Sequence, residues 1–177
     1  DRYRRQRQMC IRDSVNCPLG IGWDNEIRSV AMIVVGGSGI CTGALINNTC
    51  NDGTPYFLTA NHCLGGSTGS WAFRFNWESP PGTESCATTV GSVDPGPPYD
   101  QTANGATTLV SAAASDFALL QINNMTLSDA QNWNCFYAGW DASDLTTVTQ
   151  ATGIHHPSGD VKKICRENDA PFHSNNG

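Results

Sequence analysis

The chain has 177 residues, of which 39% are hydrophobic and 15% charged, with a formal net charge of −6 at pH 7. This length suits one domain, or two small halves of one architecture, with a buried core. No apolar run approaches the roughly 18 residues that a membrane span requires, so we expect no membrane partner.

Residues 1–14, DRYRRQRQMCIRDS, hold five of the ten basic residues and differ from everything that follows. A basic arm for nucleic acid or a membrane surface is one interpretation. RRQRQMCIRDS (4–14) also matches a translated frame of a common transposon-based sequencing adaptor, so we predict a non-native segment, Cys10 included, and exclude it from the fold. Residues 15–177 then hold 5 basic and 14 acidic side chains, a net charge of −9. This acidity argues against a nucleic-acid partner.

The rest of the chain consists of short β-prone runs separated by Gly, Pro and Asn, which predicts an all-β protein. A hairpin is expected first, in which IRSVAMIVV turns at GGSGI and continues as CTGALIN. Residues 79–105 are expected to form surface loops, and residues 124–134 a crossover between two halves. The expected strands are 27–35, 41–47, 55–60, 72–78, 106–112, 115–123, 135–140, 147–154 and 161–165. Their spacing favours a sandwich or a barrel.

The strand PYFLTA delivers His62 at its end, within FLTANHC. A lone histidine there more often caps a strand or packs in a core. As a general base, however, an imidazole must be held within reach of the proton that it takes, and a strand end next to a cysteine offers that rigidity.

Asp116 begins SDFALLQIN, at the head of an apolar strand. Capping a turn is the simpler role for such a residue. A histidine that accepts a proton on one ring nitrogen needs an acceptor for the other nitrogen, and a carboxylate also steadies the imidazolium. Asp116 is therefore the candidate partner of His62.

Several motifs occur in the order of a known family: CTGALIN, FLTANHC, SDFALL, then YAGWD and GIHHPSGD. From about residue 16 to about residue 167 the chain resembles the bacterial lysyl endopeptidase group of the chymotrypsin-type serine proteases. The resemblance implies a double β-barrel, protein or peptide substrates, and a Ser-His-Asp mechanism with His62 as general base and Asp116 as its partner. It also implies a secreted or periplasmic monomer without cofactor or metal, and, as a finer expectation, a preference for lysine.

The nucleophilic serine has no counterpart among these residues, because no G-x-S-G segment follows Asp116. GGSTG (65–69) fits G-x-S-x-G, but a hydrolase elbow needs a strand before it and a helix after it. Ser158 belongs to the GIHHP stretch that precedes the nucleophile loop in the family. We therefore expect a truncated, inactive fragment: an adaptor at 1–14, a first barrel at 15–123, and the linker and opening strands of an incomplete second barrel at 124–177.

Eight cysteines without a C-x-x-C pair predict disulfides and an oxidising compartment. The resemblance implies the bridges Cys41–Cys63 and Cys17–Cys86. Cys50 and Cys135 depart from the family form, and we expect them to pair with each other. We then expect no disulfide partner for Cys165 among these residues.

The adjacent His155 and His156 are potential metal ligands by residue type only. Neighbouring residues on a strand point to opposite faces, so we expect structural roles for them. A different class of function also stays open, namely a non-catalytic binding or adhesion module on a protease fold, because a fold does not by itself establish a function.

Overall fold

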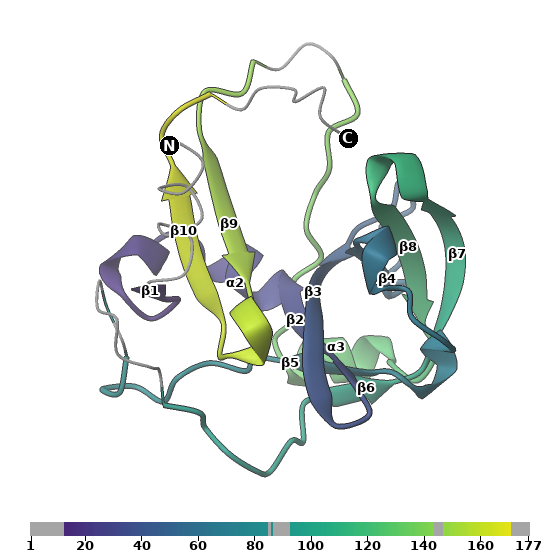
Figure 1. The fold of residues 1–177 in the computed structure, drawn as a ribbon, viewed down its shortest axis with the longest axis horizontal. Coiled ribbons are helices and arrows are strands. Elements are labelled where there is room, and N and C mark those ends of the chain that lie inside the picture. Colours follow the sequence, from purple (N-terminus) through teal and green to yellow (C-terminus); the bar gives the residue numbers. More distant parts are fainter. Residues whose placement is uncertain (1–12, 85, 87–92, 144–146, 171–177) are drawn as a thin grey trace.

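The computed structural model describes residues 13–84, 86, 93–143 and 147–170, and most of its regular structure is β (Figure 1). The strands are β1 Asp13–Ser14, β2 Val30–Val35, β3 Ser38–Ile46, β4 Tyr56–Thr59, β5 Ala72–Phe75, β6 Thr102–Asn104, β7 Ala106–Ala112, β8 Phe117–Ile122, β9 Ala151–His155 and β10 Lys163–Glu167. The α-helices are α2 Asp24–Ser29 and α3 Leu127–Asn132. Single 3-10 turns are η1 Pro18–Gly20, η2 Asn61–Cys63, η3 Thr68–Ser70, η4 Ala113–Ser115 and η5 Pro157–Gly159.

Seven strands form one antiparallel sheet in the order β6-β5-β2-β3-β4-β8-β7. The sheet curls on itself, as seen on the right of Figure 1. Strand β8 lies between β4 and β7 in the sheet and pairs with both of them. The all-β prediction is confirmed, and the curled sheet corresponds to a barrel of the chymotrypsin-like fold.

The core lies inside this curled sheet. Phe57 and Phe73 are completely buried and meet edge to face, with ring centroids 4.9 Å apart. Edge-to-face packing suits the quadrupoles of the two rings. The other buried members of the cluster are Ala31, Ile33, Leu45, Cys63, Trp71, Phe75, Ala103, Ala106, Leu120, Ile122, Met125 and Ala130. Burial of this apolar surface is what holds the sheet in its curled form.

A second sheet has three strands in the order β1-β10-β9. Strand β10 is central, and Lys163 is paired with Ser14 on one side and His155 on the other. Asp13 and Ser14 therefore belong to this sheet, although they end the segment that the sequence assigned to an adaptor. Residues 1–12 lie outside the described residues, and the proposed boundaries at 14 and 123 remain predictions.

Some element boundaries differ from those expected. The strand predicted for 27–35 begins only at Val30, because residues 24–29 form the helix α2. The strand predicted for 72–78 ends at Phe75, where Asn76 adopts a left-handed conformation with φ 48°. Residues 135–140 contribute only one isolated bridge, between Ala138 and Ile46. In each case local geometry overrides β-propensity.

The crossover predicted at 124–134 contains the short helix α3, which begins with a capping box. The Thr126 side chain accepts a bond from the Asp129 backbone N–H, and the Asp129 side chain accepts one from the Thr126 backbone N–H. Both bonds satisfy N–H groups that a helix start otherwise leaves unpaired. Among the described residues, no helix has the length and apolar character needed to cross a membrane.

Candidate active site

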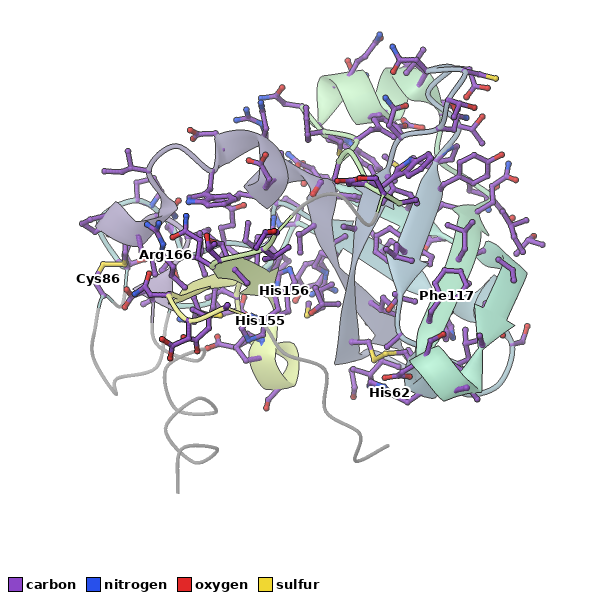
Figure 2. All side chains as sticks on the ribbon, turned by 90° about the horizontal axis from the view of Figure 1, so that it is seen from above. His62, Cys86, Phe117, His155, His156 and Arg166 are labelled. Atoms are coloured by element: carbon purple, nitrogen blue, oxygen red, sulfur yellow. A yellow bond between two sulfur atoms is a disulfide. The ribbon has the colours of Figure 1, made fainter. Side chains whose placement is uncertain are left out.

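His62 lies in the 3-10 turn η2, directly after β4, at one end of the curled sheet (Figure 2). Its neighbour Cys63 is bonded to Cys41 of β3, with the two Cα atoms 6.2 Å apart. The disulfide joins the turn to the adjacent strand. The backbone that carries the imidazole is thus covalently fixed on one side.

Asp116 meets His62 through two hydrogen bonds across 54 residues of sequence. The His62 backbone N–H donates to Asp116 Oδ1 at 2.9 Å. The ring atom Nδ1 lies 2.7 Å from Asp116 Oδ2. With Nδ1 donating to the carboxylate, Nε2 is the ring atom that can accept a proton.

A strained backbone aims the Asp116 carboxylate at the histidine. Asp116 has φ 49° and ψ 42°, in the left-handed region, where it ends η4 and precedes β8. Asp and Asn adopt this conformation more readily than most residues. The strand β8 is antiparallel to β4, so the end of β4 and the start of β8 bring both members of the pair to the same end of the sheet.

The environment keeps this carboxylate ionised. The backbone N–H of His62 is the main cause of a lowered pKa of Asp116, followed by the bond to the imidazole. Both side chains remain open to solvent, with exposed fractions of 71% for His62 and 52% for Asp116. Because exposed ion pairs are screened by water, the pair adds little to stability and its geometry serves orientation.

The predicted bridges Cys41–Cys63 and Cys17–Cys86 are both present, the second with its Cα atoms 5.7 Å apart. The expected bridge Cys50–Cys135 is not formed and that prediction is wrong for this structure. Cys50 is exposed in a turn, whereas Cys135 packs against the main core. Burial raises the pKa of the Cys135 thiol to about 12, which keeps the thiol protonated and unreactive. Cys165 is buried in β10.

No serine of the described residues has the setting of a hydrolase elbow. Ser67 of GGSTG follows η2 and runs into the 3-10 turn η3, so it has neither the strand nor the helix that an elbow requires. Ser158 is exposed in η5 with φ 53°. The sulfur atoms of Cys41 and Cys63 lie within 4.8 Å of a His62 ring nitrogen, but they are bonded to each other and do not offer thiolates to a metal.

His155 ends β9 of the second sheet and His156 directly follows it, both away from His62 (Figure 2). His156 is buried, and its Nδ1 lies 3.0 Å from the carbonyl oxygen of Asp160. Burial lowers the pKa of His156 to about 3 and also lowers that of His155. A neutral, buried imidazole bonded to backbone fits the structural role that we expected.

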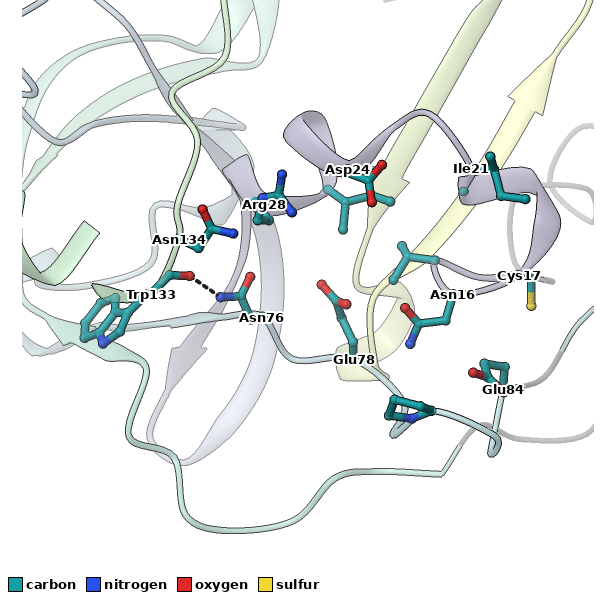
Figure 3. Close-up of a pocket in the computed structure, with 14 residues that line it drawn as sticks. Asn16, Cys17, Ile21, Asp24, Arg28, Asn76, Glu78, Glu84, Trp133 and Asn134 are labelled. Atoms are coloured by element: carbon teal, nitrogen blue, oxygen red, sulfur yellow. Dashed lines mark hydrogen bonds between the residues drawn. The ribbon is translucent and has the colours of Figure 1, made fainter. Parts of the chain in front are cut away.

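A hollow lies elsewhere, between the N-terminal turns and the segment around Glu78 (Figure 3). It has a volume of about 510 Å³ and includes the carboxylates of Asp24, Glu78 and Glu84 in its lining. Glu78 is already engaged there, since the buried Lys162 donates to its Oε1 at 3.1 Å and to the Ile27 carbonyl at 2.7 Å. The hollow is separate from the His62–Asp116 pair.

Thr59, three residues before His62, was not among the residues expected to serve the site. Thr59 is buried at the end of β4, and its hydroxyl donates to the carbonyl oxygen of Thr42 at 2.8 Å. A signal existed in FLTA, where alternation places Thr59 on the same inward face as Phe57. A polar residue at an inward position of a strand needs a specific hydrogen-bond partner.

The chain is similar to known proteins over most of its length. The family model "Lysyl endopeptidase, C-terminal domain" matches residues 6–177. The chain is also 28% identical, over 151 residues, to a lysyl endopeptidase of Pseudomonas aeruginosa strain PAO1. That match covers 82% of this chain but 31% of the relative, so the chain spans about a third of the relative's length.

Proposed function

Because the chain belongs to the lysyl endopeptidase C-terminal domain family, we propose that it supplies the general base and its orienting partner to a secreted serine endopeptidase. The base is His62 and the partner is Asp116. The observation that carries the proposal is the 2.7 Å contact between His62 Nδ1 and Asp116 Oδ2, which leaves Nε2 as the proton acceptor.

In the proposed reaction, His62 Nε2 takes the proton of a serine hydroxyl as that oxygen attacks the substrate carbonyl carbon. The peptide C–N bond then breaks, His62 returns the proton to the leaving amine, and water hydrolyses the acyl-enzyme. Asp116 holds the imidazole and stabilises its charged form. Backbone N–H groups near the serine would stabilise the oxyanion.

The nucleophilic serine is proposed to come from residues of the protein beyond these 177. The described residues alone are then inactive, because a triad acts as a unit. The substrates are proteins or peptides, with cleavage after lysine as the finer proposal. The net charge of −9 over residues 15–177 supports it, since an acidic surface attracts cationic substrates.

A longer form of the gene tests this function directly. A serine-directed fluorophosphonate should label the longer protein and leave the 177-residue chain unlabelled. Asp116→Asn should lower kcat by about 10⁴, the loss seen when this partner is changed in a chymotrypsin-type triad. Lysyl and arginyl peptides of otherwise equal sequence would measure the preference for lysine.

The matched control is His62→Ala in the same longer protein. Labelling of this variant at the wild-type rate would contradict the role of His62. If the longer coding sequence instead has Ala or Gly at the serine position, no labelling occurs and the non-catalytic binding module is supported.

A further inference from the structure

The turn that carries His62 is held by a bond that the catalytic pair does not itself make. Toward the end of β4, the backbone pairing between β3 and β4 stops at Ala44 and Leu58. One residue further, the Thr59 hydroxyl donates to the Thr42 carbonyl oxygen at 2.8 Å. The Thr59 side chain therefore links β4 to β3 just beyond the last backbone pair of the two strands.

Thr59 is placed to act on both members of the pair. Its backbone is still paired with Ala118 of β8, two residues after Asp116. Three residues after Thr59 the chain reaches His62. Because Thr59 is only 8% exposed, water competes little for its hydroxyl, and the bond fixes the point where β4 leaves β3.

Thr42 connects this point to the second sheet. Its hydroxyl oxygen accepts a bond of 2.9 Å from the backbone N–H of His156, a residue 114 positions away. His156 lies between β9 and η5, and its own ring is buried and bonded to backbone. Thr42 thus touches the end of β4 with its carbonyl and the second sheet with its side chain.

The second sheet packs closely at this place. A Cβ added to Gly159 of η5 would lie 2.9 Å from the Gly39 carbonyl oxygen, and one added to Gly39 would lie 3.0 Å from the Gly159 Cα. Only glycine allows the two backbones to approach this closely. The bond from His156 to Thr42 is therefore part of a tight contact between η5 and β3.

We propose that Thr42 and Thr59 are positioning residues for His62. Thr59 orients the end of β4, and Thr42 makes that orientation depend on the docking of β9 and η5. The inference rests on the proposed function for its catalytic meaning. Its structural content is independent, because it concerns only the geometry of the His62–Asp116 contact.

The test uses the 177-residue chain with ¹⁵N-labelled histidine. Nitrogen chemical shifts give the ratio of the Nδ1–H to the Nε2–H tautomer of His62, and hydrogen exchange gives the protection of its backbone N–H. Thr59→Val should lower both by about tenfold, the effect expected from losing one well-formed hydrogen bond. Thr42→Val should lower both by about threefold, since it acts through one further bond. Thr42→Ser and Thr59→Ser should restore wild-type values.

Thr68→Val is the matched structural control. The Thr68 hydroxyl, in η3, donates to the carbonyl oxygen of Ala106 in β7 at 2.8 Å. Ala106 is paired with Ile122, at the end of β8 opposite to Asp116. This variant should lose stability to a similar degree and leave the His62 tautomer ratio unchanged.

Equal tautomer ratios and protection in wild type, Thr42→Val and Thr59→Val would overturn the proposal. So would an equal effect of Thr68→Val. If Thr59→Val does not fold, Thr42→Val with its serine rescue decides the question alone. None of these measurements needs activity. A changed His62 signal in a protein whose longer form is inactive would therefore reject the proposed function and keep this inference.

Discussion

At the scale of residues, the contact that matters most is the one that orients the imidazole of His62. Asp116 bonds both the backbone N–H and the ring of His62, so the carboxylate fixes the position of the residue as well as the direction of its ring. The two side chains stay largely exposed, as substrate access would require. The same bonds determine how Asp116 titrates.

The Asp116 carboxyl should titrate below the usual pKa of 3.8, because two donors on residue 62 stabilise its ionised form. The contribution of these bonds is present above pH 3.8 and is lost as pH falls through the lower folded pKa. His62→Ala should leave the pKa of Asp116 lowered, though less than in the wild type, since the backbone N–H is the largest single cause. A ¹³C NMR titration of Asp116 in both proteins measures this. Return of the variant to an ordinary pKa would show that the ring is the main cause.

At the scale of elements, we expect acid to weaken the contact of β9 and η5 with the hairpin of β2 and β3. His156 lies there, buried and neutral, with its backbone bonded to Thr42. A buried imidazole must stay uncharged in the folded protein, whereas the unfolded chain lets it take a proton. Protonation of His156 at low pH should therefore destabilise this contact.

The free energy of unfolding should fall by about 1.4 kcal/mol per pH unit as a result of His156, from pH ~6.5 downward. Burial lowers the pKa of His156 in the folded chain to about 3, so between that pH and pH ~6.5 the unfolded chain binds a proton that the folded chain does not. Urea unfolding between pH 4.5 and 6.5 should show a shallower dependence for His156→Gln. The lowered pKa of His155 also makes stability fall with pH, but it does so in the wild type and in His156→Gln alike. Parallel curves for the two proteins would contradict this role.

The ion pair between the buried Lys162, which directly precedes β10, and Glu78, in the loop after β5, gives a second prediction at this scale. Glu78→Gln should destabilise the fold by about 2 kcal/mol, less than for a fully buried pair because Glu78 is 22% exposed. Lys162→Met should cost about 1 kcal/mol or less, because it removes the buried charge itself. Chemical denaturation of both variants compares them. A larger loss for Lys162→Met would mean that the ammonium bond to Ile27 dominates.

At the scale of the whole molecule, the fold conceals the residue type that the proposed enzyme attacks. The chain has two lysines, Lys162 and Lys163, with exposed fractions of 0% and 3%. Lys163 lies in the central strand of the second sheet, so its backbone is paired on both sides. Proteolysis needs an accessible, extended segment.

The folded chain should therefore resist an added lysyl endopeptidase and be cut in denaturant. Asn168→Lys places a lysine at an exposed position three residues beyond Cys165, and this variant should be cut under native conditions. Mass spectrometry of the products identifies the cleavage sites. Native cleavage of the wild type after Lys162 or Lys163 would show that the second sheet opens readily.

What the sequence by itself determined follows local pattern: the all-β class, the hairpin turn at GGSGI, and His62 and Asp116 as candidates. Such features depend on propensity and on the two-residue period of strands. The bridges Cys41–Cys63 and Cys17–Cys86 came from the family resemblance, and for Cys50 and Cys135 that resemblance offered no guide.

Only the tertiary structure decided the helix at residues 24–29, the pairing of Lys162 with Glu78, and the bond from His156 to Thr42. These depend on how a curled sheet brings distant segments together, across 84 and 114 residues for the two bonds. A short sequence pattern does not predict these long-range contacts. The free energy that brings the segments together comes from packing of the whole core, and not from the residues that meet.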